Sequence, residues 1–308
     1  MASTVKRRHS PLPPPERLGG IVLGRADSGE ADLVVTFLTR ERGLVSAVAK
    51  NAKKSVKRFG GGMLSPGRAA FYLLRMREDR EVGFVENSEP NPKAPVLPDL
   101  PLVQSLAAKA LELARAFEAR RNPAPESFDL LVRHISDLSS PPPTEPPALE
   151  ARTLSLSFAK HYLALAGFGV SFGSCRHCGR VPAPGETWRW EKREAGVVCP
   201  DCLGKMTEVS PPVPAGLLAK LDRLPPPMRR MKPFSETELG LAENYFETLA
   251  SIQAGRRFRS GDVTRALLKS GREGPAAPVA PATPKPAGEN DAPEETREET
   301  REATREEN

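Results

Sequence analysis

The sequence predicts a multidomain α+β protein, in which a small β-barrel precedes a mainly helical domain with an inserted four-cysteine metal ribbon. Three observations predict this organisation. Short runs rich in Val, Leu and Phe fill residues 18–90, segments with helical periodicity follow in 91–270, and all four cysteines lie in two Cys-x-x-Cys pairs. Prolines cluster between these parts and mark boundaries, because proline breaks helices and cannot donate a hydrogen bond within a sheet.

Five strand-like runs make up residues 18–90. Val, Ile, Phe and Tyr favour extended backbone, and Arg40–Gly43, between two of the runs, has the length and the glycine of a hairpin turn. Five short strands in one small domain are typical of a closed barrel, of either the oligonucleotide-binding (OB) type or the SH3-like type. The predicted strands cover residues 18–24, 32–39, 44–50, 69–77 and 81–87.

Residues 91–270 change to the period of helices. Leu106, Leu113 and Phe117 lie on one apolar stripe, and Ser235-x-x-Glu238 has the pattern of a capping box at the start of a helix. The domain is therefore expected to be mainly helical. The predicted helices cover residues 102–121, 126–138, 149–165, 235–249 and 262–269.

Both ends of the chain are expected to lie outside the folded domains. Residues 1–17 carry bases and prolines without the apolar segment of a secretory signal, which predicts a flexible N-terminus. Residues 271–308 end in the repeat EETR-EETR-EATR-EE, and disorder is expected there because no apolar stripe can be buried. No stretch approaches the ~20 apolar residues of a membrane span. A cytoplasmic location without a membrane partner is expected.

The cysteines have the spacing of metal knuckles. Cys175-x-x-Cys178 and Cys199-x-x-Cys202 each let two thiolates converge on one ion, about 2.3 Å away for zinc, and two knuckles complete a tetrahedron. The alternatives are disulfides, which a cytosolic location disfavours, or a redox dithiol, which needs a thioredoxin-like helix. The pattern favours one Zn²⁺ per chain in a ribbon over about residues 173–206. Its role is structural, because four thiolates leave no position open for a reacting water.

Charge is distributed unevenly along the chain. The formal net charge is +6, but residues 272–308 hold ten acids against five bases, so the remainder carries +11. Residues 40–80 hold eleven bases against three acids, and the densest run, Lys50–Arg58, lies in a loop between two predicted strands. Such a loop on a barrel suits a nucleic-acid backbone, and the alternative is a solvated polar loop. The candidate DNA-binding residues are Arg40, Arg42, Lys50, Lys53, Lys54, Lys57, Arg58, Phe59 and Arg68.

The sequence lacks the common catalytic motifs. Residues 62–69 have the glycine spacing of a phosphate loop, but Arg68 and Ala69 stand where Lys and Ser or Thr are required. The histidines are scattered, and His177 lies inside the first knuckle, where it does not reach the same ion. The protein is therefore expected to have no catalytic site.

A family resemblance is strongest in residues 21–62, which read IVLGRADSGEADLVVTFLTRERGLVSAVAKNAKKSVKRFGGG. This segment resembles the N-terminal domain of the RecO family of bacterial recombination mediators. The shared features are the GExD turn at residues 29–32, the strand end TRE at 39–41, the Gly43 turn and the lysine-rich loop ending in RFG at 58–60. The knuckles are similar to those of RecO members that carry metal, and the similarity covers about residues 18–270.

The resemblance implies an OB-fold barrel, a helical domain and an inserted zinc ribbon. It also implies binding of single- and double-stranded DNA in the nucleoid, annealing of complementary strands, association with RecR, and help to RecA in replacing single-strand-binding protein (SSB) on gapped DNA. The family does not hydrolyse nucleotides, which agrees with the missing phosphate loop. The long acidic tail departs from the family pattern. Our hypothesis is that residues 272–308 mimic DNA and compete for the basic face.

Two other functions fit the residues less well. A protein-interaction scaffold would dock partners through the ribbon and the helices, with only incidental DNA contact. A metal-dependent nuclease would need an acidic metal cluster in the barrel, and the barrel sequence offers none.

Overall fold

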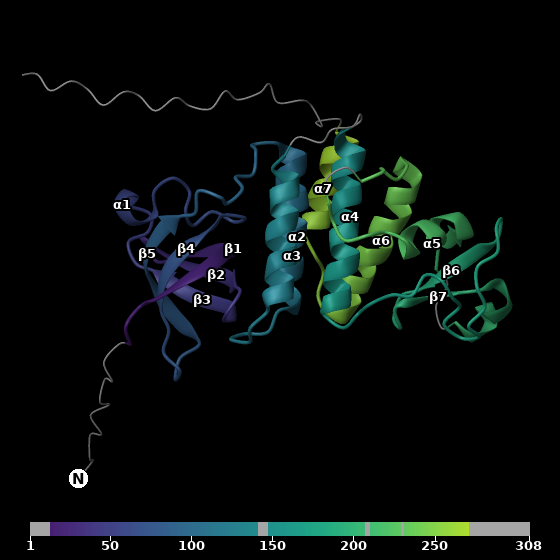
Figure 1. The fold of residues 1–308 in the computed structure, drawn as a ribbon, viewed down its shortest axis with the longest axis horizontal. Coiled ribbons are helices and arrows are strands. Elements are labelled where there is room, and N and C mark those ends of the chain that lie inside the picture. Colours follow the sequence, from purple (N-terminus) through teal and green to yellow (C-terminus); the bar gives the residue numbers. More distant parts are fainter. Residues whose placement is uncertain (1–12, 141–146, 207–209, 229–230, 271–308) are drawn as a thin grey trace, which may run out of the picture. The chain divides into compact units, whose positions relative to one another are not determined.

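The computed structural model describes residues 13–140, 147–206, 210–228 and 231–270 (Figure 1). The acidic tail, residues 272–308, lies outside these residues, so the structure does not test the hypothesis that the tail mimics DNA. Within the described ranges, no helix is both long enough and apolar enough to cross a membrane.

Five strands close into a barrel in the order β1-β2-β3-β5-β4, drawn in purple and blue in Figure 1. The neighbouring strands are antiparallel except for β3 and β5, which are parallel. This closed, OB-like barrel confirms the predicted fold class. The strands are β1 (Glu16–Ser28), β2 (Asp32–Thr39), β3 (Gly43–Ala49), β4 (Ala69–Arg75) and β5 (Val82–Pro90).

Alternating side chains fill the barrel. Phe37 on β2 and Tyr72 on β4 are both fully buried, and their ring centroids lie 4.5 Å apart. The Tyr72 hydroxyl donates to the Met63 carbonyl oxygen at 2.8 Å, so its polar atom is satisfied inside the core. Strand β1 has an irregular register between Val22 and Gly24, and such a bulge bends a strand in the way that closure requires.

The part of the chain that follows the barrel is mainly helical, as predicted. Helix α4 packs against α2, α3 and α6, and α7 packs against α2. The predicted capping box is present, since the Ser235 hydroxyl accepts from the Glu238 N–H at 3.3 Å and the Glu238 carboxylate accepts from the Ser235 N–H at 3.0 Å. The helices are α2 (Pro101–Phe117), α3 (Pro125–Leu138), α4 (Pro147–Leu165), α5 (Ala215–Asp222), α6 (Glu236–Gln253) and α7 (Ser260–Lys269).

Helix α2 ends at Phe117, before the predicted end at residue 121, because the chain then pairs with the barrel. The Leu44 N–H donates to the Ala119 carbonyl and the Arg121 N–H donates to the Leu44 carbonyl, both at 3.2 Å. Gly43 allows this approach. Its φ is +59°, and a Cβ there would overlap the Asn122 carbonyl.

His134 is a fully buried titratable residue on α3. Its ring stacks on Phe158 of α4 with centroids 4.4 Å apart. Neither ring nitrogen has a hydrogen-bond partner within the described residues. Burial lowers the pKa of His134 to about 3, because the charged imidazolium loses its hydration.

We expect His134 to make the protein less stable in acid. An unfolded histidine titrates near pH 6.5, so between about pH 6.5 and pH 3 the unfolded chain binds the extra proton, and stability falls as the pH falls. From pH 7 to pH 5 the loss is about 2 kcal/mol. His134→Leu should remove this part of the pH dependence in urea unfolding, whereas His177→Leu at an exposed site should keep it. Equal pH dependence in His134→Leu and the wild type would contradict the assignment.

Candidate metal centre and nucleic-acid interface

Two knuckles flank a small sheet that interrupts the helical domain. The first knuckle closes when the Gly179 N–H donates to the Cys175 carbonyl at 2.9 Å, and Gly179 has a φ of +74°. The second follows β7, where the Cys202 N–H donates to the Cys199 carbonyl at 3.1 Å. The ribbon consists of β6 (Thr187–Glu191), β7 (Gly196–Val198), the 3-10 helix η1 (Pro200–Lys205) and β8 (Pro212–Pro214), with sheet order β7-β6-β8.

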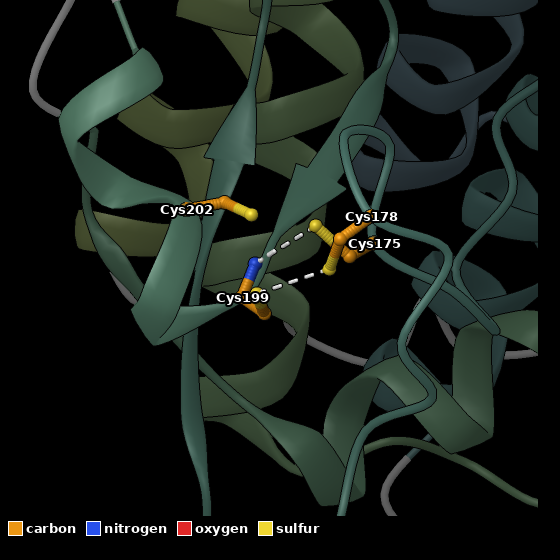
Figure 2. Close-up of side chains that lie close together, drawn as sticks. All are labelled: Cys175, Cys178, Cys199 and Cys202. Carbon is orange, nitrogen blue, oxygen red and sulfur yellow. Dashed lines mark hydrogen bonds between the residues drawn. The ribbon is translucent and has the colours of Figure 1, made fainter.

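The four sulfur atoms point toward one another from the two knuckles (Figure 2). All four lie within 4.8 Å of one another, and the Sγ atoms of Cys178 and Cys199 are 3.6 Å apart. A tetrahedral zinc ion with bonds of about 2.3 Å places its sulfur ligands about 3.8 Å from each other. The cysteines are free thiols, and three of them are buried while Cys178 is exposed. The group could therefore hold a metal ion and fits zinc.

Backbone N–H groups favour the thiolate form of Cys175 in the first knuckle, and a thiolate is the form that binds a metal cation. Burial opposes ionisation of Cys175, but N–H groups of Cys199, Cys178 and His177 lower the pKa of this thiol to about 6. The Cys199 N–H lies 3.4 Å from the Cys175 Sγ, as Figure 2 shows. Burial and the neighbouring sulfurs instead raise the pKa of Cys202 to about 12. A metal ion would supply the positive charge that all four thiolates need.

Aromatic rings join the ribbon to the helical domain. Trp190 of β6 stacks on Tyr245 of α6 with centroids 4.2 Å apart, and Phe172 meets both rings edge-on. The Tyr245 hydroxyl donates to the Gly196 carbonyl at 3.4 Å. The ribbon therefore shares its core with the helices.

The predicted cationic loop forms a short projection from the barrel, which we call the basic finger (residues 50–59). It ends in the one-turn helix α1 (Val56–Phe59), which packs against β5 (Figure 1). Lys54 and Lys57 are exposed, and neither has an ion-pair partner within the described part of the chain. The Lys50 ammonium lies 5.4 Å from the centroid of the Phe84 ring. Within the described residues, these three are the exposed lysines of the finger that have no ion-pair partner.

Other predicted residues already have partners. The Arg40 guanidinium binds both Asp129 carboxylate oxygens at 3.2 Å, and this hydrogen bond with Asp129 raises the pKa of Arg40. Arg42 binds the Glu16 carboxylate in the same bidentate manner, at 3.1 and 2.6 Å. These two pairs hold the turn between β2 and β3 against α3 and β1. The Arg40 and Arg42 side chains are 53% and 50% exposed, so both ion pairs lie at the surface, and DNA contact by these two residues stays a prediction.

The remaining members of the predicted set fold back on the finger or the barrel. Lys53 pairs with Asp27 at 3.1 Å, and Arg58 donates to the Lys50 carbonyl at 2.6 Å. Phe59 is only 7% exposed and packs into the barrel core, so its ring is not available to stack on a base. The Nε of Arg68 is buried without a hydrogen-bond partner within the described residues.

The structure points to two aromatic residues that the sequence interpretation missed. Phe71 on β4 and Phe84 on β5 are half-buried on the outside of the barrel, and each lies beside a cation. The Arg17 guanidinium is 3.7 Å from the centroid of the Phe71 ring, while Phe84 faces Lys50. The sequence could have indicated Phe71, because successive side chains of a strand point to opposite faces. Tyr72 points into the barrel, so its neighbour Phe71 points outward.

These features define a class of protein with two kinds of site. An OB-like barrel carries a cationic finger, and a helical domain holds a four-cysteine centre that could bind metal. Two family models match the chain, Recombination protein O N terminal over residues 16–91 and Recombination protein O C terminal over residues 103–261. The chain belongs to the RecO family.

Individual relatives agree with this assignment. The DNA repair protein RecO of Anaeromyxobacter dehalogenans strain 2CP-C is 35% identical over 244 residues, covering 79% of this chain and 87% of the relative. That of Myxococcus xanthus is 33% identical over 251 residues, covering 79% and 93%. That of Synechococcus sp. strain JA-3-3Ab is 30% identical over 288 residues, covering 88% and 90%. A general role in recombinational DNA repair follows from this membership.

Proposed function

We propose that the protein is a non-catalytic recombination mediator. It binds single- and double-stranded DNA, anneals complementary strands, and acts with RecR to help RecA replace SSB on gapped DNA. The observation that carries this proposal is the basic finger, which presents Lys50, Lys54 and Lys57 from an OB-like barrel in a member of the RecO family.

The finger suits contacts that ignore sequence. Lysine is a compact charge on a flexible stem, so it neutralises a phosphate without fixing a base, and each contact releases counterions from the DNA. Annealing requires this behaviour, because both strands must be held while their bases remain free to pair. Phe84, which is half-buried on the outside of the barrel, adds a face on which an unpaired base stacks, a contact worth about 1–3 kcal/mol.

In this proposal the four-cysteine centre holds one structural Zn²⁺. Cys175, Cys178, Cys199 and Cys202 would ligate it, and the ion would neutralise thiolates that otherwise repel one another. Chemistry on a substrate is not assigned to the centre, because four protein ligands fill the coordination sphere. The role of the metal centre in this proposal is structural, because it holds the ribbon against α6.

The test is annealing of two complementary oligonucleotides coated with SSB. Fluorescence quenching measures the rate at which the two strands pair. The wild-type protein with one zinc per chain is expected to accelerate annealing over the SSB-coated strands alone, and addition of RecR should promote RecA loading. Failure to anneal either bare or coated strands, combined with tight binding to RecR or SSB, would overturn the proposal in favour of a protein-interaction scaffold. Cleavage of the DNA in the presence of Mg²⁺ would instead identify a nuclease.

A further inference from the structure

A short loop joins α6 to α7 and carries three arginines around one phenylalanine. Residues 254–259 read AGRRFR, and the loop holds no acidic residue. Arg256, Arg257 and Arg259 are all exposed, with 79% of the Arg257 side chain open to solvent. Arg115 is exposed on α2, one turn from the point where the loop meets that helix. We call these four arginines the arginine surface.

The loop is fixed to α2 through a single residue, Glu112. The Glu112 carboxylate accepts from the Arg259 N–H at 3.3 Å, from the Ser260 N–H at 3.1 Å and from the Ser260 hydroxyl at 2.7 Å. The Glu112 backbone carbonyl accepts from the Arg256 guanidinium at 3.2 Å. The carboxylate is therefore bound to the backbone and a hydroxyl of the loop, and it forms no ion pair with an arginine side chain within the described residues.

The arginine surface keeps most of its positive charge. Arg257 pairs with Asp262 at 2.8 Å, and both side chains are exposed. Arg115, Arg256 and Arg259 have no ion-pair partner within the described residues. Unpaired guanidinium groups on a fixed loop suit phosphate, because the planar fork of arginine matches two phosphate oxygens.

The arginine surface differs from the basic finger in stiffness. Phe258 is half-buried against the helical core, and the guanidinium carbon of Arg256 lies 5.1 Å from the centroid of its ring. The loop backbone and the Arg256 side chain are thus held before a ligand binds, whereas the finger lysines are charges on flexible stems. A duplex suits the fixed arrangement, because its phosphates repeat regularly and its paired bases offer no free face for stacking.

We infer that the arginine surface binds the backbone of double-stranded DNA, whereas the basic finger binds single strands. The inference rests on the proposed function, since it gives the duplex product of annealing a site of its own. Separate sites favour repeated annealing, because a duplex that moves to the arginine surface leaves the finger open to the next strand.

The experiment measures the affinity of the full-length protein for a fluorescent single strand and for a blunt duplex of the same sequence. The test variant replaces the three arginines that lack an ion-pair partner, namely Arg115→Gln, Arg256→Gln, Arg259→Gln. The control variant makes the same change in net charge at exposed positions elsewhere, namely Lys93→Gln, Arg223→Gln, Lys232→Gln. Urea unfolding checks that each variant is folded.

The test variant is expected to bind the duplex about a hundredfold more weakly than the wild type, about fivefold for each lost phosphate contact. Its affinity for the single strand should stay within twofold of the wild type. The slope of log affinity against log salt should fall by about 2.7 on the duplex, since each contact contributes about 0.9. The control variant should match the wild type on both forms of DNA.

Three results would overturn the arginine surface as a duplex site. They are a duplex affinity of the test variant within twofold of the wild type, an equal loss in the control variant, and an equal loss on both forms of DNA. Binding of neither form by the wild type would overturn the proposed function as well. If the test variant does not fold, Arg115→Gln decides the question, because Arg115 takes no part in the contacts of the loop. A fivefold loss on the duplex alone supports the inference, and an unchanged affinity contradicts it.

Discussion

Replacement of Cys199 by serine is expected to yield a protein without zinc and with an unfolded ribbon. Structural zinc contributes about 10–16 kcal/mol of apparent binding free energy to small metal domains, and whole domains are stable by only about 5–15 kcal/mol. The ribbon sheet cannot replace that contribution, because its strands have five, three and three residues. Emission from Trp188 and Trp190 should shift to longer wavelength as both rings meet water.

The damage should spread into the helical domain but affect the barrel less. Loss of the ribbon uncovers Tyr245, and removal of a large ring from a core costs about 3–5 kcal/mol. The barrel has its own apolar core around Phe37 and Tyr72, so it should lose less stability than the helical domain. His177→Ala is the matched control within the first knuckle, and it should keep its zinc. A Cys199→Ser protein with one zinc per chain and wild-type emission would contradict the assignment of the ligands.

Reversal of three charges on the basic finger is expected to abolish annealing. In the triple variant Lys50→Glu, Lys54→Glu, Lys57→Glu, each lost phosphate contact costs about 1 kcal/mol in water, so the affinity for single strands falls by about a hundredfold. Repulsion between the new carboxylates and phosphates adds to this loss. The fold should survive, because all three side chains point to solvent or lie on the barrel surface.

The control for this variant has the same change in net charge. Lys93, Lys205 and Lys232 are exposed lysines outside the barrel, and their joint replacement by glutamate should leave annealing close to the wild-type rate. Equal loss in the two triple variants would mean that only the overall charge attracts DNA. Unchanged annealing by the finger variant would remove the finger from the interface.

The barrel and the metal site could be predicted because their signals are local. Strand β2 matches its predicted bounds, residues 32–39, since turn-forming residues flank one uninterrupted apolar run. The cysteine pairs carry their geometry in their spacing, and the structure brings all four sulfurs together. In both cases a few neighbouring residues determine the outcome.

The parts that the sequence did not predict depend on distant partners. Arg40 meets Asp129 from 89 positions away, and nothing near Arg40 indicates that its charge is already paired. Helix α5, at residues 215–222, is short and follows prolines, so its apolar residues did not show a clear period. Phe59 turns inward because α1 is a single helical turn that places this ring against the barrel core. The sequence showed only that Phe59 follows Arg58 in a cationic loop, which is why it was predicted to bind DNA.

Salt dependence of single-strand binding tests most directly whether the finger contacts the DNA backbone. Affinity for a fluorescent oligonucleotide is measured from 50 to 300 mM salt for the wild type and for Lys50→Gln, Lys54→Gln, Lys57→Gln. Three lost phosphate contacts should reduce the slope of log affinity against log salt by about 2, since each contributes about 0.7 on single strands. Identical slopes in the two proteins would show that these lysines do not bind phosphate and would contradict the account.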